Sequence, residues 1–191
     1  MAPDGDARRR ILEATYACVA RWGLSKTTVE DAARQAGLSR ATVYRYFPGG
    51  REELITAVVS WQYFEFFARL YAEVQDAGSL EEVLERGLVF ARRAFLEHEV
   101  LQMVLKTEPE VLLPTLTVEA NRTIGMISAF LVPYLERHPL ADGVDVHQAA
   151  DFLARMILSY IGSAGHWDLA DPAQVATLVR TELLAGVVTR D

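Results

Sequence analysis

The chain contains little cysteine, few prolines and no long apolar run. Its 191 residues include one cysteine, Cys18, so neither a disulfide framework nor a cysteine-based metal site can form within one chain. The seven prolines are scattered, and no sustained apolar–polar alternation predicts β-strands. No stretch reaches the roughly 18 apolar residues of a membrane span, and the first residues lack a signal core. These absences predict a cytoplasmic protein with no membrane partner.

Helix-forming residues dominate what is present. Hydrophobic residues make up 51% of the chain, with abundant alanine, leucine, valine and glutamate. We therefore expect an all-α protein of about nine helices, with a DNA-binding domain over residues 1–50 and a second helical domain over residues 51–191. The expected helices span 6–22, two short segments within 27–47, then 51–75, 80–98, 118–137, 144–164 and 172–188. Short pieces broken by Pro109 and Pro114 precede residue 118, and Pro133 predicts a kink or an early stop.

Charge is distributed unevenly along the chain, whose net charge is −7. Residues 1–60 carry nine Lys/Arg and seven Asp/Glu, whereas residues 61–191 carry ten basic and nineteen acidic residues. The first part is therefore slightly basic and the second strongly acidic. This asymmetry fits a nucleic-acid-binding N-terminal part and a second part that faces away from the phosphates.

Residues 23–37 predict a short capped helix. Thr27 and Thr28 supply N-cap hydroxyls, and Glu30 and Asp31 follow three residues after them, as in a capping box. An apolar stripe of valine and alanine runs along the segment. Gly37 tolerates a positive φ and ends the helix.

A second short helix follows one tight turn later. Ser39 is its N-cap, and Val43 and Phe47 stand four residues apart on the side that faces inward. The opposite side carries aromatic and cationic residues, namely Arg40, Thr42, Tyr44, Arg45 and Tyr46. A small solvent-facing surface of this composition is typical of a DNA contact surface, with a recognition helix at about 39–47.

The segment from Arg8 to about Val58 resembles the DNA-binding domain of the TetR family of bacterial transcriptional repressors. The matching elements are Ile11-Leu12-Glu13-Ala14, the Thr27-Thr28 cap, Ala36-Gly37-Leu38-Ser39, Val43-Tyr44-Arg45-Tyr46-Phe47 and Glu52-Glu53-Leu54. The resemblance implies a transcriptional regulator, by default a repressor. It would bind double-stranded, pseudo-palindromic operator DNA as a homodimer and be released by an apolar small-molecule effector. It implies neither cofactor nor metal.

The family pattern also implies roles for individual residues. Arg40 would read a base, because its guanidinium can bond guanine O6 and N7 together. Ala41 and Thr42 would contact a thymine methyl, and Arg45 would contact either a base or a phosphate. Phosphate and sugar contacts would come from Thr28, Ser39, Tyr44 and Tyr46. The chain departs from the pattern at Gly50, where the family usually has a phosphate-binding lysine; either Arg51 replaces it or one contact is missing.

The acidic part contains more aromatic residues than a single helix face can hold, for example between Trp61 and Phe67. Each one alone is most simply a core residue, yet some must face a cavity, a partner helix or another subunit. The family resemblance implies a small-molecule pocket here. We expect it to be lined by Trp61, Phe64, Phe95, Glu108, Asn121, Met126, Phe130 and Tyr134, with the polar members orienting the ligand.

The last two expected helices are rich in small residues, which let helices approach closely. Packing against the same helices of a second chain predicts a four-helix bundle, and intramolecular packing alone remains the alternative. The expected interface residues are Ala154, Ile157, Ile161, Leu178, Leu183 and Gly186.

Two alternative functions are compatible with parts of the sequence. His147 with Asp151, and Glu97-His98-Glu99, pair imidazole with carboxylate, but no further convergent ligands accompany them, so we do not expect an enzyme. The second alternative is a DNA-binding dimer whose C-terminal domain contacts protein partners instead of a ligand. A closed aromatic cavity, as opposed to a filled core, would distinguish ligand sensing from that alternative.

Overall fold

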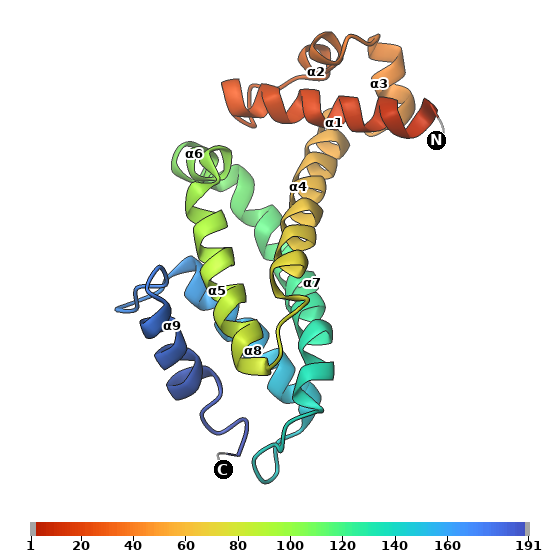
Figure 1. The fold of residues 1–191 in the computed structure, drawn as a ribbon. Helices are drawn as coiled ribbons and strands as arrows, with labels where there is room; N and C mark the ends of the chain where they lie inside the picture. Colours follow the sequence, from red (N-terminus) through yellow and green to blue (C-terminus); the bar gives the residue numbers. More distant parts are fainter. Residues whose placement is uncertain (1–2, 190–191) are drawn as a thin grey trace. The chain divides into compact units, whose positions relative to one another are not determined.

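The computed structural model describes residues 3–189, and the side chains of residues 5–110 and 120–189. Nine α-helices make up most of this part (Figure 1). They are α1 (Pro3–Trp22), α2 (Val29–Ala36), α3 (Arg40–Tyr46), α4 (Gly50–Val74), α5 (Leu80–Glu97), α6 (Glu99–Thr107), α7 (Pro109–Leu135), α8 (Val146–Gly162) and α9 (Pro172–Leu178). A π-helical turn, η1 (Val179–Leu183), continues α9. The described residues contain no strand, and the expected all-α class is confirmed.

Local capping chemistry sets the ends of the short helices. The Thr28 hydroxyl accepts a hydrogen bond from the Asp31 N–H at 3.1 Å, and Gly37 adopts φ 65° at the end of α2. The Ser39 hydroxyl caps α3 by accepting from the Thr42 N–H at 3.1 Å. Thr27 does not act as a cap: its hydroxyl is buried and donates to the Gly23 carbonyl at 2.7 Å.

The expectation that Pro109 and Pro114 break the chain into short helical pieces before residue 118 is wrong. One helix, α7, runs without a break from Pro109 to Leu135 and includes both Pro114 and Pro133. Pro109 is its first residue, where the missing N–H costs nothing. An interior proline costs about 3 kcal/mol, which the remaining hydrogen bonds and packing of a long helix can offset.

The chain divides into two compact units. The first comprises the chain up to Phe67 together with His98–Leu116, and the second comprises Ala68–Glu97 and the chain from Thr117 onward. In the first unit, α1 and α2 pack around Ile11, Ala32 and Val43, all of which are completely buried. Val104 of α6 lies in a smaller cluster with Val19 and Leu24, so α6 belongs to the same unit as α1, α2 and α3.

In the second unit, α5 packs against α8 and α9. Its completely buried side chains include Leu80, Leu135, Leu153 and Leu178. A segment near the C-terminus pairs with the loop after α7, since the Ala141 N–H donates to the Val187 carbonyl at 3.0 Å. Among the helices of the described residues, none is long and apolar enough to cross a membrane.

Candidate DNA interface and ligand pocket

The helix α3 is held by its buried side. Val43 and Phe47 are 0% and 1% exposed, as expected from their spacing, and they pack into the core of the first unit. Arg10 of α1 donates to the Ala36 carbonyl at 2.8 Å, which fixes the end of α2. This rigid frame presents the opposite side of α3 to solvent.

The solvent side of α3 carries the residues expected to contact DNA. Arg40, Ala41, Tyr44 and Arg45 are exposed, and Tyr44 retains 41% of its surface. Thr42 and Tyr46 are half-buried, and Tyr46 packs partly against the core of the first unit. The exposed face therefore combines two guanidinium groups with an aromatic ring.

Arg40 is held by two neighbours. Its Nη2 lies 2.5 Å from Oε1 of Glu30 on α2, and its guanidinium carbon lies 6.0 Å from the centre of the Tyr44 ring. Arg45 instead stacks on Tyr46, with 5.0 Å between guanidinium carbon and ring centre. The Glu30 contact joins two helices, and no sequence pattern pointed to it.

Thr28 and Ser39 are occupied in capping α2 and α3. The Ser39 and Thr42 hydroxyls also lie 2.9 Å apart, and the Thr28 hydroxyl donates to the Asp31 carboxylate at 2.6 Å. Both residues are nonetheless exposed. Their caps leave the hydroxyl oxygens at the helix N-termini, where backbone dipoles favour phosphate.

Gly50 and Arg51 explain the departure from the family pattern. Gly50 has φ 68°, and a Cβ added to it would lie 3.3 Å from the Tyr44 ring, so a lysine is disfavoured here. Arg51 is engaged inside the unit: its Nε donates to the Thr27 carbonyl at 2.9 Å and its Nη2 to the Leu24 carbonyl at 2.6 Å. These bonds favour a structural role for Arg51 over a phosphate contact.

Three residues expected in the ligand pocket lie in the first unit. Trp61 stands edge-on to Tyr16, with ring centres 6.3 Å apart, and packs against the core around α1. Phe64 is 49% exposed. Glu108 accepts hydrogen bonds from Ser25 in the turn after α1. Trp61 and Glu108 therefore contact α1 and the turn that follows it.

The other five lie in the second unit. Phe130 and Tyr134 are neighbours on α7, with ring centres 5.4 Å apart, while Phe95 and Met126 are half-buried. Asn121 is exposed. The eight expected residues thus divide between the two units.

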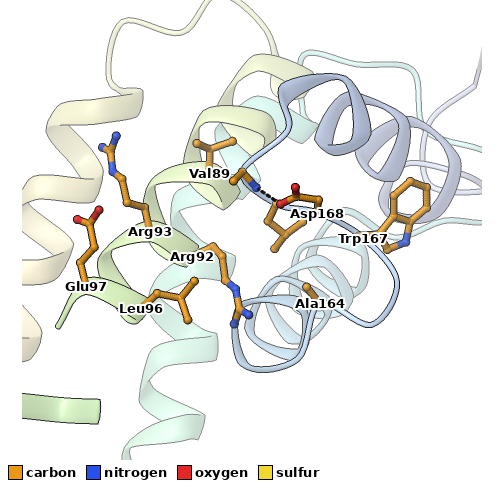
Figure 2. Close-up of a pocket in the computed structure, with 10 residues that line it drawn as sticks. Val89, Arg92, Arg93, Leu96, Glu97, Ala164, Trp167 and Asp168 are labelled. Carbon is orange, nitrogen blue, oxygen red and sulfur yellow. Dashed lines mark hydrogen bonds between the residues drawn. The ribbon is translucent and has the colours of Figure 1, made fainter. Parts of the chain in front are cut away.

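A pocket of about 510 Å³ lies in the second unit, between α5 and the loop that joins α8 to α9 (Figure 2). Its lining consists of Val89, Arg92, Arg93, Leu96, Glu97, Ala164, Trp167, Asp168, Leu169 and Ala170. None of these residues was expected from the sequence. Arg92 points toward Ala164 and donates to the Ile161 carbonyl at 2.7 Å, whereas Arg93 points away from it (Figure 2).

A polar network braces one wall of this pocket. The Trp167 indole N–H donates to Glu182 at 3.1 Å, and the Tyr160 hydroxyl donates to the same carboxylate. Burial, followed by this hydrogen bond and the charge of Glu182, raises the pKa of Tyr160 to about 12. The network fixes the loop after α8 against the turn η1.

The expected dimer residues fall into two groups. Ala154, Leu178 and Leu183 are completely buried within the single chain, so their side chains pack inside the second unit and offer no surface to a partner. Ile157 and Ile161 are half-buried and Gly186 is exposed. The large exposed apolar side chain of α8 is Phe152, at 43%.

The histidine–carboxylate pairs have ordinary structural contacts. The His98 Nδ1 accepts a hydrogen bond from the Leu101 N–H at 3.1 Å and so caps α6. Asp151 binds Arg155 at 2.7 Å instead of His147. In the part of the chain that the structure describes, no three His, Cys, Asp or Glu side chains gather as metal ligands would.

The comparisons with known proteins separate the N-terminal residues from the rest of the chain. Residues 11–58 match the family described as bacterial regulatory proteins, tetR family. Over 103 residues, the chain is 30% identical to an uncharacterized HTH-type transcriptional regulator of Mycobacterium bovis, covering 54% of this chain and 52% of that protein. It is 35% identical to the HTH-type transcriptional repressor KstR2 of Mycobacterium tuberculosis, covering 51% and 48%. The chain thus spans about half the length of these curated relatives.

The fold extends the likeness to the rest of the chain. The crystal structure of the TetR family repressor AlkX from a Dietzia strain has a TM-score of 0.62 to this chain, with 24% identity and 98% of both chains covered. The exposed face of α3 and the match over residues 11–58 define a helix-turn-helix domain of the class found in bacterial transcriptional regulators. Residues 11–58 belong to the TetR family of bacterial regulatory proteins.

Proposed function

We propose that the protein binds a pseudo-palindromic operator as a homodimer in the bacterial cytoplasm and represses transcription by blocking access to the promoter. The observation that carries the proposal is the solvent side of α3, with Arg40, Tyr44 and Arg45 exposed above the buried Val43. The name of the relative KstR2, a transcriptional repressor, supports the sign of regulation. Two such helices related by a two-fold axis fit two half-sites about 34–36 Å apart.

Dimerisation is proposed through the solvent-facing sides of α8 and α9. Gln148, Phe152, Arg155 and Ser159 are exposed at helical spacing along α8, whereas the half-buried Ile157 and Ile161 lie on its opposite side, with the buried Leu153 and Ala154. Isologous contact of these faces would form a four-helix bundle with the partner chain. In that contact Phe152 would be buried and would supply apolar surface to the interface.

An apolar small molecule is proposed as the effector. AlkX is described as a repressor implicated in biodegradation of n-alkanes, which supports an apolar effector by analogy. Two parts of the second unit are suitable contacts: the aromatic pair Phe130 and Tyr134, and the pocket around Leu96 and Trp167. The effector would release DNA only if it binds the DNA-free form more tightly than the bound form.

Selection of the full chain against random DNA duplexes tests the proposal. We expect an enriched two-fold symmetric sequence, bound by a dimer in light scattering. Failure to enrich any sequence would overturn operator binding. The neutral fluorescent probe N-phenyl-1-naphthylamine tests for an apolar site, and saturable uptake is expected. A dimer that binds operator but takes up no probe would favour the alternative in which the second unit contacts another protein.

A further inference from the structure

We propose that Glu30 of α2 sets the specificity of the DNA interface by holding Arg40 in position. The inference rests on the proposed operator binding, because Arg40 is the residue proposed to read a base. It adds a residue outside the recognition helix to the determinants of sequence preference.

The contact joins the first turns of two helices. Glu30 is the second residue of α2 and Arg40 the first residue of α3, and Nη2 of Arg40 lies 2.5 Å from Oε1 of Glu30. Both helices are anchored by buried residues, Val29 and Ala33 on α2 and Val43 on α3. The carboxylate therefore has a fixed position from which to orient the guanidinium.

The neighbouring acidic residue of α2 has partners of its own, so Glu30 is the carboxylate that pairs with Arg40. The other acidic residue of the first turn of α2, Asp31, is paired with Arg34 and accepts the Thr28 hydroxyl. The Tyr44 ring lies near the Arg40 guanidinium, whose carbon is 6.0 Å from the ring centre. Arg40 is thus directed by a carboxylate and an aromatic ring before DNA is present.

This arrangement affects base reading through conformational entropy. A guanidinium has five N–H donors on more than one edge, so one donor can bind Glu30 while others remain for a base. A guanine is read by two donors held in a fixed orientation. An arginine that is already ordered loses less side-chain freedom on binding, and the gain is realised only where both donors find acceptors.

The charge of Glu30 has a second, opposite effect. A carboxylate beside the interface repels phosphates of every sequence; at a separation of about 7 Å in water this repulsion corresponds to about threefold in affinity. Glu30 therefore lowers overall affinity and raises discrimination. The two effects are separable, because the repulsion of phosphates depends on the charge of the Glu30 side chain, whereas the orientation of Arg40 depends also on its length.

Two substitutions separate them. Glu30→Gln removes the charge and keeps the length, whereas Glu30→Asp keeps the charge and shortens the side chain. The matched control is Glu13→Gln, since Glu13 is also an exposed acid of the first unit, paired with Arg9 at 2.9 Å. Both Glu30 and Arg40 are exposed, with side-chain exposures of 48% and 59%, so the folded state should survive either change.

Affinities are measured for three duplexes: the selected operator, an operator changed at the base pair whose preference Arg40→Ala abolishes, and an unrelated sequence. We expect Glu30→Gln to bind the unrelated duplex about threefold more tightly. In both Glu30 variants, the ratio of the affinities for the first two duplexes should fall about tenfold. With Glu30→Asp, binding to the unrelated duplex should stay within about twofold of wild type. Glu13→Gln should leave the preference unchanged.

Wild-type preference in both Glu30 variants would overturn the inference. A uniform change on all three duplexes would do the same, because it reports charge alone. In an Arg40→Ala background, the effect of Glu30→Gln on preference should disappear, and its persistence would count against the proposal. If the wild-type protein selects no operator, operator binding itself has failed, which is a different result. Thermal melting of each variant identifies any that has lost its fold.

Discussion

Glu108 at the end of α6 accepts two hydrogen bonds from Ser25, one from the backbone N–H at 2.9 Å and one from the hydroxyl at 3.1 Å. Ser25 lies in the turn between α1 and α2. From another direction, Arg51 of α4 donates to the carbonyls of Leu24 and Thr27 in the same turn. This turn is therefore the place where α4 and α6 are both joined to the DNA-binding helices.

Removal of the Glu108 side chain should weaken the first unit. Glu108→Ala leaves the Ser25 N–H to solvent, and we expect a loss of about 1 kcal/mol and a melting temperature lower by about 2–4 °C. Glu108→Gln, which keeps one oxygen acceptor, should lose less. Calorimetry measures both, with the exposed Glu110→Ala as control. A normal melting temperature combined with a lost effector response would instead assign Glu108 to the ligand site.

Arg51→Lys should be destabilising although the charge is kept. A single ammonium group cannot match the two bonds that the guanidinium makes to the Leu24 and Thr27 carbonyls, so we expect a cost of about 1–3 kcal/mol. The salt dependence of DNA binding should not change, because these donors point into the unit. In contrast, Arg45→Ala should reduce the slope of log affinity against log salt by about one if Arg45 contacts a phosphate. A reduced slope for Arg51→Lys would contradict the structural role.

Arg40→Ala and Tyr46→Phe should affect DNA binding in different ways. The loss of a base-reading guanidinium should relax preference at one operator position, at a cost of about 1–3 kcal/mol there. Tyr46→Phe should weaken all sequences about equally, because a phosphate contact carries no sequence information. Binding curves on a series of single-position operator variants distinguish the two outcomes. The same uniform loss for both substitutions would refute this division of roles.

Stability should fall in alkali because of Tyr160. Its pKa is raised to about 12 in the folded chain, whereas an unfolded tyrosine ionises near pH 10. The contribution of the protonated hydroxyl is therefore complete below about pH 10 and is lost as the pH rises toward 12. Urea unfolding between pH 8 and pH 12 should show this loss, and Tyr160→Phe should reduce it. An equal loss in Tyr160→Phe and in the exposed Tyr71→Phe would exclude the Tyr160–Glu182 hydrogen bond as its cause.

Features that depend on neighbouring residues could be predicted from the sequence. The caps at Thr28, Gly37 and Ser39 each involve a few adjacent positions, and the spacing of Val43 and Phe47 identified the buried side of α3. The contact between Glu108 and Ser25 spans 83 positions and has no local signal. The Glu30–Arg40 pair joins two helices, and their spacing in the sequence does not reveal the angle between them.

Composition also could not show whether buried residues pack within one chain or between two chains. Ala154 and Leu183 belong to an apolar, small-residue pattern that fits packing within a chain as well as packing between chains. The structure buries both completely within the second unit. Similarly, an excess of aromatic residues indicates buried surface but not its location, and Trp61 packs against Tyr16 of α1.

Phe152 provides the sharpest test of the proposed dimer. It is 43% exposed on α8, so Phe152→Glu adds no buried charge to the single chain and should leave helical content unchanged. In an isologous contact the change would place two carboxylates in one apolar interface, where desolvation is costly. We expect light scattering to detect monomers at micromolar concentration and the affinity for a full operator to fall, while binding to a half-site is retained. The matched control is Phe64→Glu, because Phe64 is an equally large aromatic side chain, 49% exposed on α4. If Phe152→Glu remains as dimeric as Phe64→Glu, the partner does not contact this face of α8.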